Sequence, residues 1–186
     1  MESSNEALLT TIKQLGFLKD TLRTAWTSQG KQESTAEHSW RLALFCLFAN
    51  DLFPEADELK LVKLALCHDL GEAYTGDIAA PLQTDNQQRQ QAEYQSVAEL
   101  LAPLSVAQRQ EWLNLIQEYQ AGTSYEAQIV KALDKMETII QHNQGATPQD
   151  FDYAFNLQYG KNLSDAVPEL SPLRKLIDAE TAQQLS

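Results

Sequence analysis

The adjacent residues His68 and Asp69 have the clearest capacity for chemistry in this chain of 186 residues. They follow the apolar run Leu-Ala-Leu-Cys at residues 64–67. Burying an imidazole and a carboxylate without partners is energetically costly, and a bound cation offsets that cost. Because both groups are good ligands for divalent first-row metals, the pair predicts half of a metal site.

The other half must come from elsewhere, and the chain has only three histidines. His38 follows Ser34 and Glu37, whose spacing is that of a capping box, so His38 should lie in the first turn of a helix. Asp134 lies within a third segment, residues 125–142, whose apolar residues recur at helical spacing. The remaining histidine, His142, falls near the end of that segment and is interpreted as a structural or surface residue.

In chain order, His38, His68-Asp69 and Asp134 give the H…HD…D pattern of the HD-domain metal phosphohydrolases, which the chain resembles. The resemblance covers roughly residues 8–160 and is closest to the 5'-deoxynucleotidase branch. The segments that carry it are His68 to Ile78, Arg23-Thr-Ala-Trp26, Glu37-His38-Ser39 and Val130-Lys131-Ala-Leu-Asp134. Eukaryotic members have glycine where this chain has Ala25.

The resemblance implies a role for each residue of the site. One divalent ion, Mn, Co, Zn, Fe or Mg, would lower the pKa of bound water towards ~7. Glu72 would be catalytic and handle protons, and the substrate would be a deoxyribonucleoside 5'-monophosphate. The metal ligands would be His38, His68, Asp69 and Asp134, and the substrate would be bound by Arg23, Trp26 and Asp77. Members of this branch form homodimers, and the aromatic C-terminal region is a candidate contact surface.

Other interpretations remain open at this point. Asp134 belongs to a segment whose charges could form a solvated helix face. Glu72 could pair with a nearby Arg or Lys, Asp77 could cap the turn at Gly76, and Arg23 and Trp26 could be a surface and a core residue. The same metal site could act on a cyclic nucleotide, a nucleoside triphosphate or an alarmone. A nucleotide-binding regulatory module without turnover is the alternative outside enzymes.

Composition limits these possibilities further. Apolar residues make up 43% of the chain and charged residues 22%, and no apolar run approaches the roughly 20 residues needed to cross a bilayer. The acidic start is unlike a secretory signal, so we expect a cytoplasmic protein without a membrane partner. Cys46 and Cys67 should be reduced core residues. The net charge of -12 argues against a nucleic acid polymer as a partner.

Helical periodicity dominates the chain and predicts an all-α fold, a single HD-domain helical bundle over residues 1–186. The motifs form a core of about residues 23–140, and C-terminal helices should pack on it. Polar loops are expected at about residues 23–34 and 74–83. Helices are expected at about residues 6–22, 35–52, 57–71, 85–101, 105–119 and 125–142, in a short aromatic stretch after residue 150, and from Pro172 onward.

Overall fold

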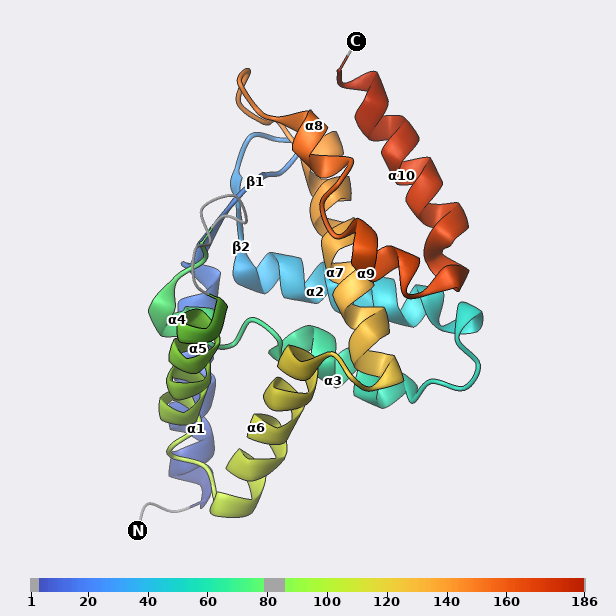
Figure 1. The fold of residues 1–186 in the computed structure, drawn as a ribbon. Helices are drawn as coiled ribbons and strands as arrows, with labels where there is room; N and C mark the ends of the chain where they lie inside the picture. Colours follow the sequence, from blue (N-terminus) through green and yellow to red (C-terminus); the bar gives the residue numbers. More distant parts are fainter. Residues whose placement is uncertain (1–3, 79–85, 186) are drawn as a thin grey trace.

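Helices account for almost all of the regular structure in the computed structural model, which describes residues 4–78 and 86–185 (Figure 1). The helices are α1 (Ser4–Gln14), α2 (Thr35–Ala49), α3 (Glu58–Cys67), α4 (Glu72–Thr75), α5 (Asn86–Leu100), α6 (Val106–Ala121), α7 (Tyr125–Gln144), α8 (Tyr153–Asn156), α9 (Lys161–Asp165) and α10 (Ser171–Gln183). Short 3₁₀ turns cover Leu15–Lys19, Asn50–Leu52 and Pro168–Leu170. The strands are β1 (Leu22–Trp26) and β2 (Gln32–Ser34). No helix in the described ranges is both long enough and apolar enough to cross a bilayer.

Two apolar clusters hold the bundle together. The larger joins α2, α3 and α7, where Leu42, Leu64 and Leu133 are fully buried, and Ile177 of α10 completes it. The smaller joins α5 and α6 to the residues after α3 and includes Leu100. Burial of one such side chain contributes about 1.5–3 kcal/mol. The expected all-α fold is therefore confirmed, and the His-Asp pair lies where the two clusters meet.

The N-terminal part of the chain differs from the expectation. The helix expected to reach residue 22 ends at Gln14, and the expected polar loop contains a two-stranded antiparallel hairpin in which Leu22 pairs with Ser34. Two contacts with distant residues hold β1. The amide of Ala146 donates to the carbonyl of Thr27 (3.1 Å), and the side chain of Gln141 donates to the carbonyl of Trp26. Strands this short carry no visible alternation in sequence.

The helix that leads to the His-Asp pair also ends earlier than expected. It was expected to run from 57 to 71, but α3 ends at Cys67 and tighter turns follow. After these turns Gly71 allows a close approach to α5, because a Cβ atom there would lie 2.8 Å from the backbone of Glu93. The hydroxyl of Ser96 also donates to the carbonyl of Gly71, at 2.5 Å. Packing against α5 therefore determines the path of the chain after the pair.

The remaining elements follow the expected order. α6 begins at a capping box formed by Ser105 and Gln108 and ends at Gly122 in the left-handed conformation. The Asp134 helix is α7, and the tail forms α10. In the expected loop at 74–83, α4 takes the first residues, and residues 79–83 lie outside the described ranges. A single domain over residues 1–186 stays a prediction.

Candidate metal centre and active site

Three helices bring the four expected metal ligands together. His38 is the fourth residue of α2, whose start is fixed by the predicted capping box: the Ser34 hydroxyl accepts from the Glu37 amide, and the Glu37 carboxylate accepts from the Ser34 amide. His68 caps the end of α3, and Asp69 follows it in the turn. Asp134 lies in the middle of α7 and is buried. All four side chains therefore reach the junction of α2, α3 and α7.

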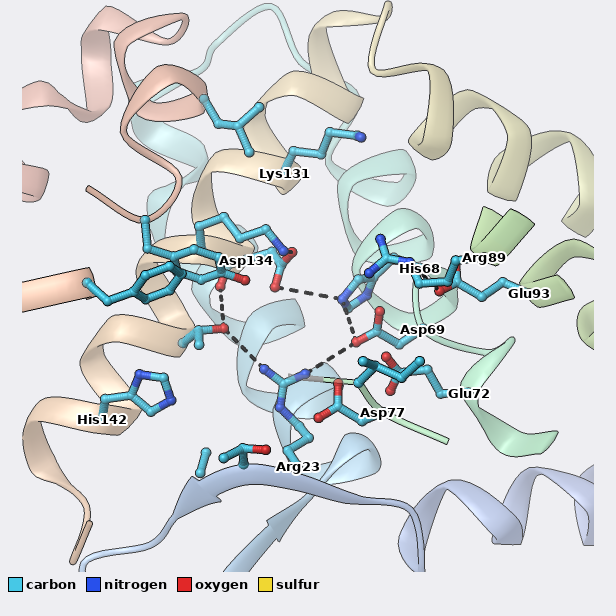
Figure 2. Close-up of a pocket in the computed structure, with 18 of the residues that line it drawn as sticks. Arg23, His68, Asp69, Glu72, Asp77, Arg89, Glu93, Lys131, Asp134 and His142 are labelled. Atoms are coloured by element: carbon cyan, nitrogen blue, oxygen red, sulfur yellow. Dashed lines mark hydrogen bonds and ion pairs between the residues drawn. The ribbon is translucent and has the colours of Figure 1, made fainter. Parts of the chain in front are cut away.

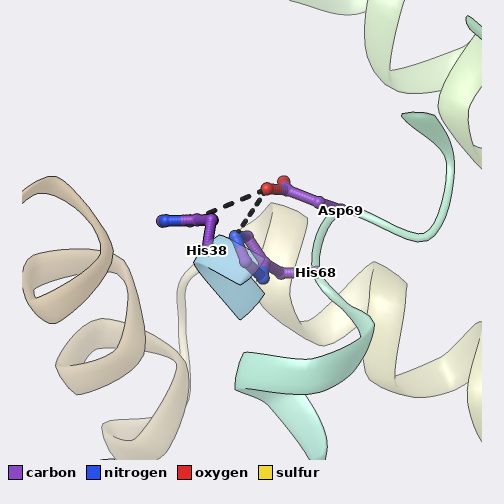
Figure 3. Close-up of side chains that lie close together, drawn as sticks. All are labelled: His38, His68 and Asp69. Atoms are coloured by element: carbon purple, nitrogen blue, oxygen red, sulfur yellow. Dashed lines mark ion pairs between the residues drawn. The ribbon is translucent and has the colours of Figure 1, made fainter. Parts of the chain in front are cut away.

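The polar atoms of these side chains surround one point. The Nε2 atom of His38 lies 3.2 Å from Oδ1 of Asp134 and 3.8 Å from Oδ2 of Asp69. The Nε2 atom of His68 lies 2.9 Å from the same Asp69 oxygen and 3.9 Å from Oδ1 of Asp134. Figure 3 shows His38, His68 and Asp69 turned toward one another. Two imidazole nitrogens and two carboxylate oxygens are thus presented together.

Hydrogen bonds on the far side of each ring fix which nitrogen faces this point. Nδ1 of His68 lies 2.9 Å from the carbonyl of Ala65, and Nδ1 of His38 lies 2.5 Å from a carboxylate oxygen of Glu137. Because these oxygens only accept, Nδ1 carries the proton and Nε2 presents its lone pair. Both Nε2 atoms are buried, and among the described residues their nearest polar neighbours are carboxylate oxygens, which cannot donate a hydrogen bond to a lone pair. The donor set fits a divalent cation, which would satisfy both nitrogens.

Charge around the point favours a cation as well. Burial and the charge of Arg23 oppose protonation of His38, but Glu137 and Asp134 raise its pKa, so its Nε2 attracts positive charge that a proton or a bound cation would supply. Lys135 lies 2.8 Å from Oδ2 of Asp134, and the hydroxyl of Tyr119 donates to the same oxygen at 3.0 Å. These contacts hold Oδ2 on the outer side, so Oδ1 turns to the two histidines. The pKa of Asp134 stays well below its ordinary value despite burial, chiefly because of Lys135.

Arg23 of β1 forms the next layer of the site. Its Nη1 lies 3.6 Å from Asp69, its Nη2 donates to the hydroxyl of Thr138 at 3.1 Å, and its Nε lies 3.3 Å from the buried Glu33 (Figure 2). Burial opposes the charge, yet Asp69 and Asp77 hold the Arg23 pKa above its ordinary value. A permanently charged guanidinium therefore lies beside Asp69, where a phosphate could contact both it and a cation.

Glu72 and Asp77 lie on the same side as Arg23 in Figure 2. The Thr35 hydroxyl donates to the Glu72 carboxylate at 2.9 Å. Burial, with the charges of Asp69 and Asp77, raises the Glu72 pKa above its ordinary value. Burial also raises the pKa of Asp77, whose carboxylate accepts a hydrogen bond from the backbone of Thr24.

A cavity of about 700 Å³ connects these groups. Ligand pockets usually enclose about 300–1,000 Å³, so the cavity is large enough for a nucleotide. His38 lies fully buried behind the wall that Asp69 and Asp134 form. The other seven residues singled out from the sequence line the cavity: Arg23, Trp26, His68, Asp69, Glu72, Asp77 and Asp134.

Several residues of the site were missed from the sequence. Glu137 is only 1% exposed, and it accepts from His38 and from Nε of Arg41 at 2.5 Å each. The interpretation of this segment as a solvated charged face is therefore wrong. Glu137 lies one helical turn after Asp134, which is the signal that could have found it. Tyr119 and Glu33 had no comparable signal, because their partners Asp134 and Arg23 lie in other elements. Lys135 contacts Asp134, its neighbour in the same helix.

Comparison with known protein families gives a match to the HD domain over residues 15–172. Among curated proteins, "5'-deoxynucleotidase HDDC2" of Dictyostelium discoideum is 35% identical over 69% of this chain and 72% of that protein. The protein of the same name in Homo sapiens is 31% identical over 74% of this chain and 68% of its own length. "5'-deoxynucleotidase hdd1" of Schizosaccharomyces pombe is 33% identical over 68% of this chain and 66% of its own length.

Solved structures share the fold. A predicted metal-dependent phosphohydrolase from Magnetospirillum magnetotacticum superposes with a TM-score of 0.79 at 22% identity and covers 99% of this chain and 96% of its own. A conserved hypothetical protein from Pyrococcus furiosus gives a TM-score of 0.62 at 30% identity. The match covers 92% of this chain and 98% of the other. The arrangement of helices is therefore shared along nearly the whole chain.

Proposed function

The chain belongs to the HD domain family, and we propose that it hydrolyses deoxyribonucleoside 5'-monophosphates to deoxynucleosides and phosphate. The names of its curated relatives support this activity. The observation that carries the proposal is the pair of unsatisfied Nε2 atoms, of His38 and His68, facing the carboxylates of Asp69 and Asp134. Three elements far apart in sequence supply these groups, and a fold without a metal site has no reason to bury them together.

The ion would be held by His38, His68, Asp69 and Asp134. It would supply a Lewis acid for the phosphate and lower the pKa of a water molecule. We propose one divalent ion, Mn, Co, Zn, Fe or Mg, because imidazole and carboxylate ligands suit all five.

The other residues act on the substrate directly. Arg23 pairs with the phosphate beside Asp69, since its guanidinium is already held there by Thr138 and Glu33. Glu72, whose pKa is raised by burial and by the nearby carboxylates, donates a proton to the 5' oxygen as the bond to phosphorus breaks. Asp77 and Trp26 line the cavity beside Arg23 and bind the sugar.

Deoxyribose is favoured by the surroundings of Asp77. The carboxylate is already engaged by the backbone of Thr24, and it lies in a partly buried position. An enclosed carboxylate near C2' leaves no room for a 2' hydroxyl. Such a steric and desolvation mismatch costs about 1–3 kcal/mol, which corresponds to ten- to two-hundredfold selectivity.

The lining of the cavity favours a monophosphate over a polyphosphate. Acidic side chains outnumber basic ones among the described residues that line it. A triphosphate or an alarmone would bring several more negative charges into this lining. The intact ligand set and Glu72 also favour turnover over a purely regulatory nucleotide-binding role.

We further propose that the protein acts in the cytoplasm as a homodimer. Two free, buried cysteines, Cys46 and Cys67, suit a reducing compartment. In the aromatic C-terminal region Phe151, Phe155 and Tyr159 line the cavity, so we take α2 as the contact face. Its Trp40 and Phe48 are 62% and 82% exposed and lie on one side of the helix. Sedimentation of the parent and of Phe48→Ser tests this, and a monomeric parent would contradict it.

The activity is tested by phosphate release from dAMP and AMP with each of the five metals. We expect the parent to show a kcat/KM for dAMP at least tenfold above that for AMP, because of the steric and desolvation mismatch at Asp77. Asp77→Ala should lose both rate and discrimination. Asp165→Ala, an exposed position on α9 outside the cavity lining, is the matched control and should keep both. A parent that releases no phosphate with any metal, or treats both sugars alike, would overturn the proposal.

A further inference from the structure

The cavity extends well past the candidate metal ligands. On α7 it is lined by a single stripe of side chains at residues 131, 134, 135, 138 and 142. At 1.5 Å per residue, His142 lies about 12 Å along the helix axis from Asp134. Figure 2 shows Asp134 and His142 on the same helix with Arg23 opposite the space between them. The groups that would act on phosphate lie only around the part of the cavity near Asp134.

The far part of the cavity has an aromatic wall. The ring of Phe151 packs on that of His142, with centroids 4.6 Å apart, and on that of Tyr153 at 4.8 Å. Phe151 and His142 are half-buried and both line the cavity, as does Phe155. Tyr153 holds the Phe151 ring from the side, and its own hydroxyl is hydrogen-bonded to Thr147 at 2.6 Å. The wall is therefore preorganised and offers aromatic surface to the cavity.

A single residue of β1 links this wall to the sugar position. The backbone of Thr24 is hydrogen-bonded both to the carboxylate of Asp77 and to the imidazole of His142. Asp77 and the aromatic wall therefore lie close together, separated only by the backbone of Thr24. A nucleotide with its phosphate at Arg23 and its sugar at Asp77 has its base directed toward His142 and Phe151.

The opposite end of the cavity is less suited to a base. Arg89 and Glu93 form an ion pair there, with Nε and Oε1 3.3 Å apart, and Lys131 donates to the carbonyl of Gln120 at 3.2 Å. These charged groups would have to be desolvated against a heteroaromatic ring. At the aromatic end the two carboxylates that line the cavity, Asp150 and Asp152, are exposed to solvent. The rings between them and α7 offer stacking, which prefers offset or edge-to-face ring geometry.

We propose that Phe151 and His142 form the subsite for the base of the substrate and bind it by stacking. The inference rests on the proposed function and adds the means by which the cavity distinguishes a nucleotide from a simple sugar phosphate. Every base has a π face, so a stacking subsite accepts all four bases with similar affinity. The described lining therefore explains why one cavity would serve the whole set of deoxynucleotides.

The test compares dAMP with 2-deoxyribose 5-phosphate, which has the same phosphate and sugar but no base. In the parent we expect kcat/KM for dAMP to exceed that for the sugar phosphate by roughly 5- to 100-fold, the range of one base–aromatic stack. Phe151→Leu keeps an apolar side chain but removes the ring. It should bring this ratio close to one, and the change should come mainly from the KM for dAMP.

The matched control is Tyr125→Leu, which removes a partly exposed ring at the start of α7 that packs on Phe53 and does not line the cavity. It should keep the parent ratio. Because the readout is a ratio within one protein, partial unfolding of a variant lowers both substrates and leaves the ratio unchanged. An unchanged ratio in Phe151→Leu, or a parent ratio near one, would overturn the subsite alone. Absence of dAMP hydrolysis in the parent would overturn the proposed function and the subsite with it.

Discussion

Replacing Glu137 with glutamine should weaken metal binding without removing a metal ligand. The Glu137 carboxylate is buried, and its two oxygens accept from Nδ1 of His38 and from Nε of Arg41, each at 2.5 Å. Glutamine has one acceptor oxygen and one NH₂ group. Whichever way the amide is turned, either Nδ1 of His38 or Nε of Arg41 faces the NH₂ group, which is itself a donor. Either the His38 ring loses the bond that fixes its tautomer, or the partly buried Arg41 guanidinium loses its carboxylate partner.

The size of the effect follows from these contacts. Removing one partner of a buried charged pair costs about 3–5 kcal/mol of folding free energy. Loss of the partner that orients a histidine ligand lowers metal affinity by about 10- to 100-fold. That loss corresponds to about 1.4–2.7 kcal/mol of binding free energy. Both effects are large relative to ordinary measurement error.

Two measurements on the same purified variant separate these effects. Urea unfolding of the metal-free protein gives the stability change, and competition with a chromophoric chelator gives the dissociation constant for Mn²⁺. The matched control is Glu111→Gln. The Glu111 side chain is 57% exposed and pairs with Lys63 at the surface. It should change stability by less than about 1 kcal/mol and leave metal affinity intact. A Glu137→Gln protein that is destabilised but binds Mn²⁺ as the parent does would refute the positioning role.

Other predictions concern the ligands and the thiols. Asp69→Asn should lose metal and activity together, whereas Glu72→Ala should keep its metal and lose turnover, because Glu72 handles a proton. The metal content of the two purified variants decides this. Equal loss of metal from both would make Glu72 a ligand. Burial raises the pKa of Cys46 and Cys67 to about 12, so iodoacetamide at mildly alkaline pH should label them only after denaturation. Stoichiometric labelling of the native protein, followed by mass spectrometry, would contradict that burial.

The sequence alone indicated the ligand types, their order and the helix that carries His38. These features are local. The capping box needs only Ser34 and Glu37, and the apolar stripes of α2 and α7 follow from helical periodicity within each segment. The family match confirmed the resemblance based on these motifs. The roles of the individual site residues stay predictions that the variants above test.

The tertiary structure decided which side chains complete the site. The spacing of Glu137 from Asp134 is local, but His38 is 99 positions away, so only the fold could show that Glu137 is buried against this imidazole. After α3 the chain passes close to α5 at Gly71, and the backbone at the end of β1 is held by α7 and the residues after it. His142 was interpreted as structural or surface, yet it lines the cavity with Phe151. In each case the deciding interaction joins distant segments, and only the folded chain brings them into contact.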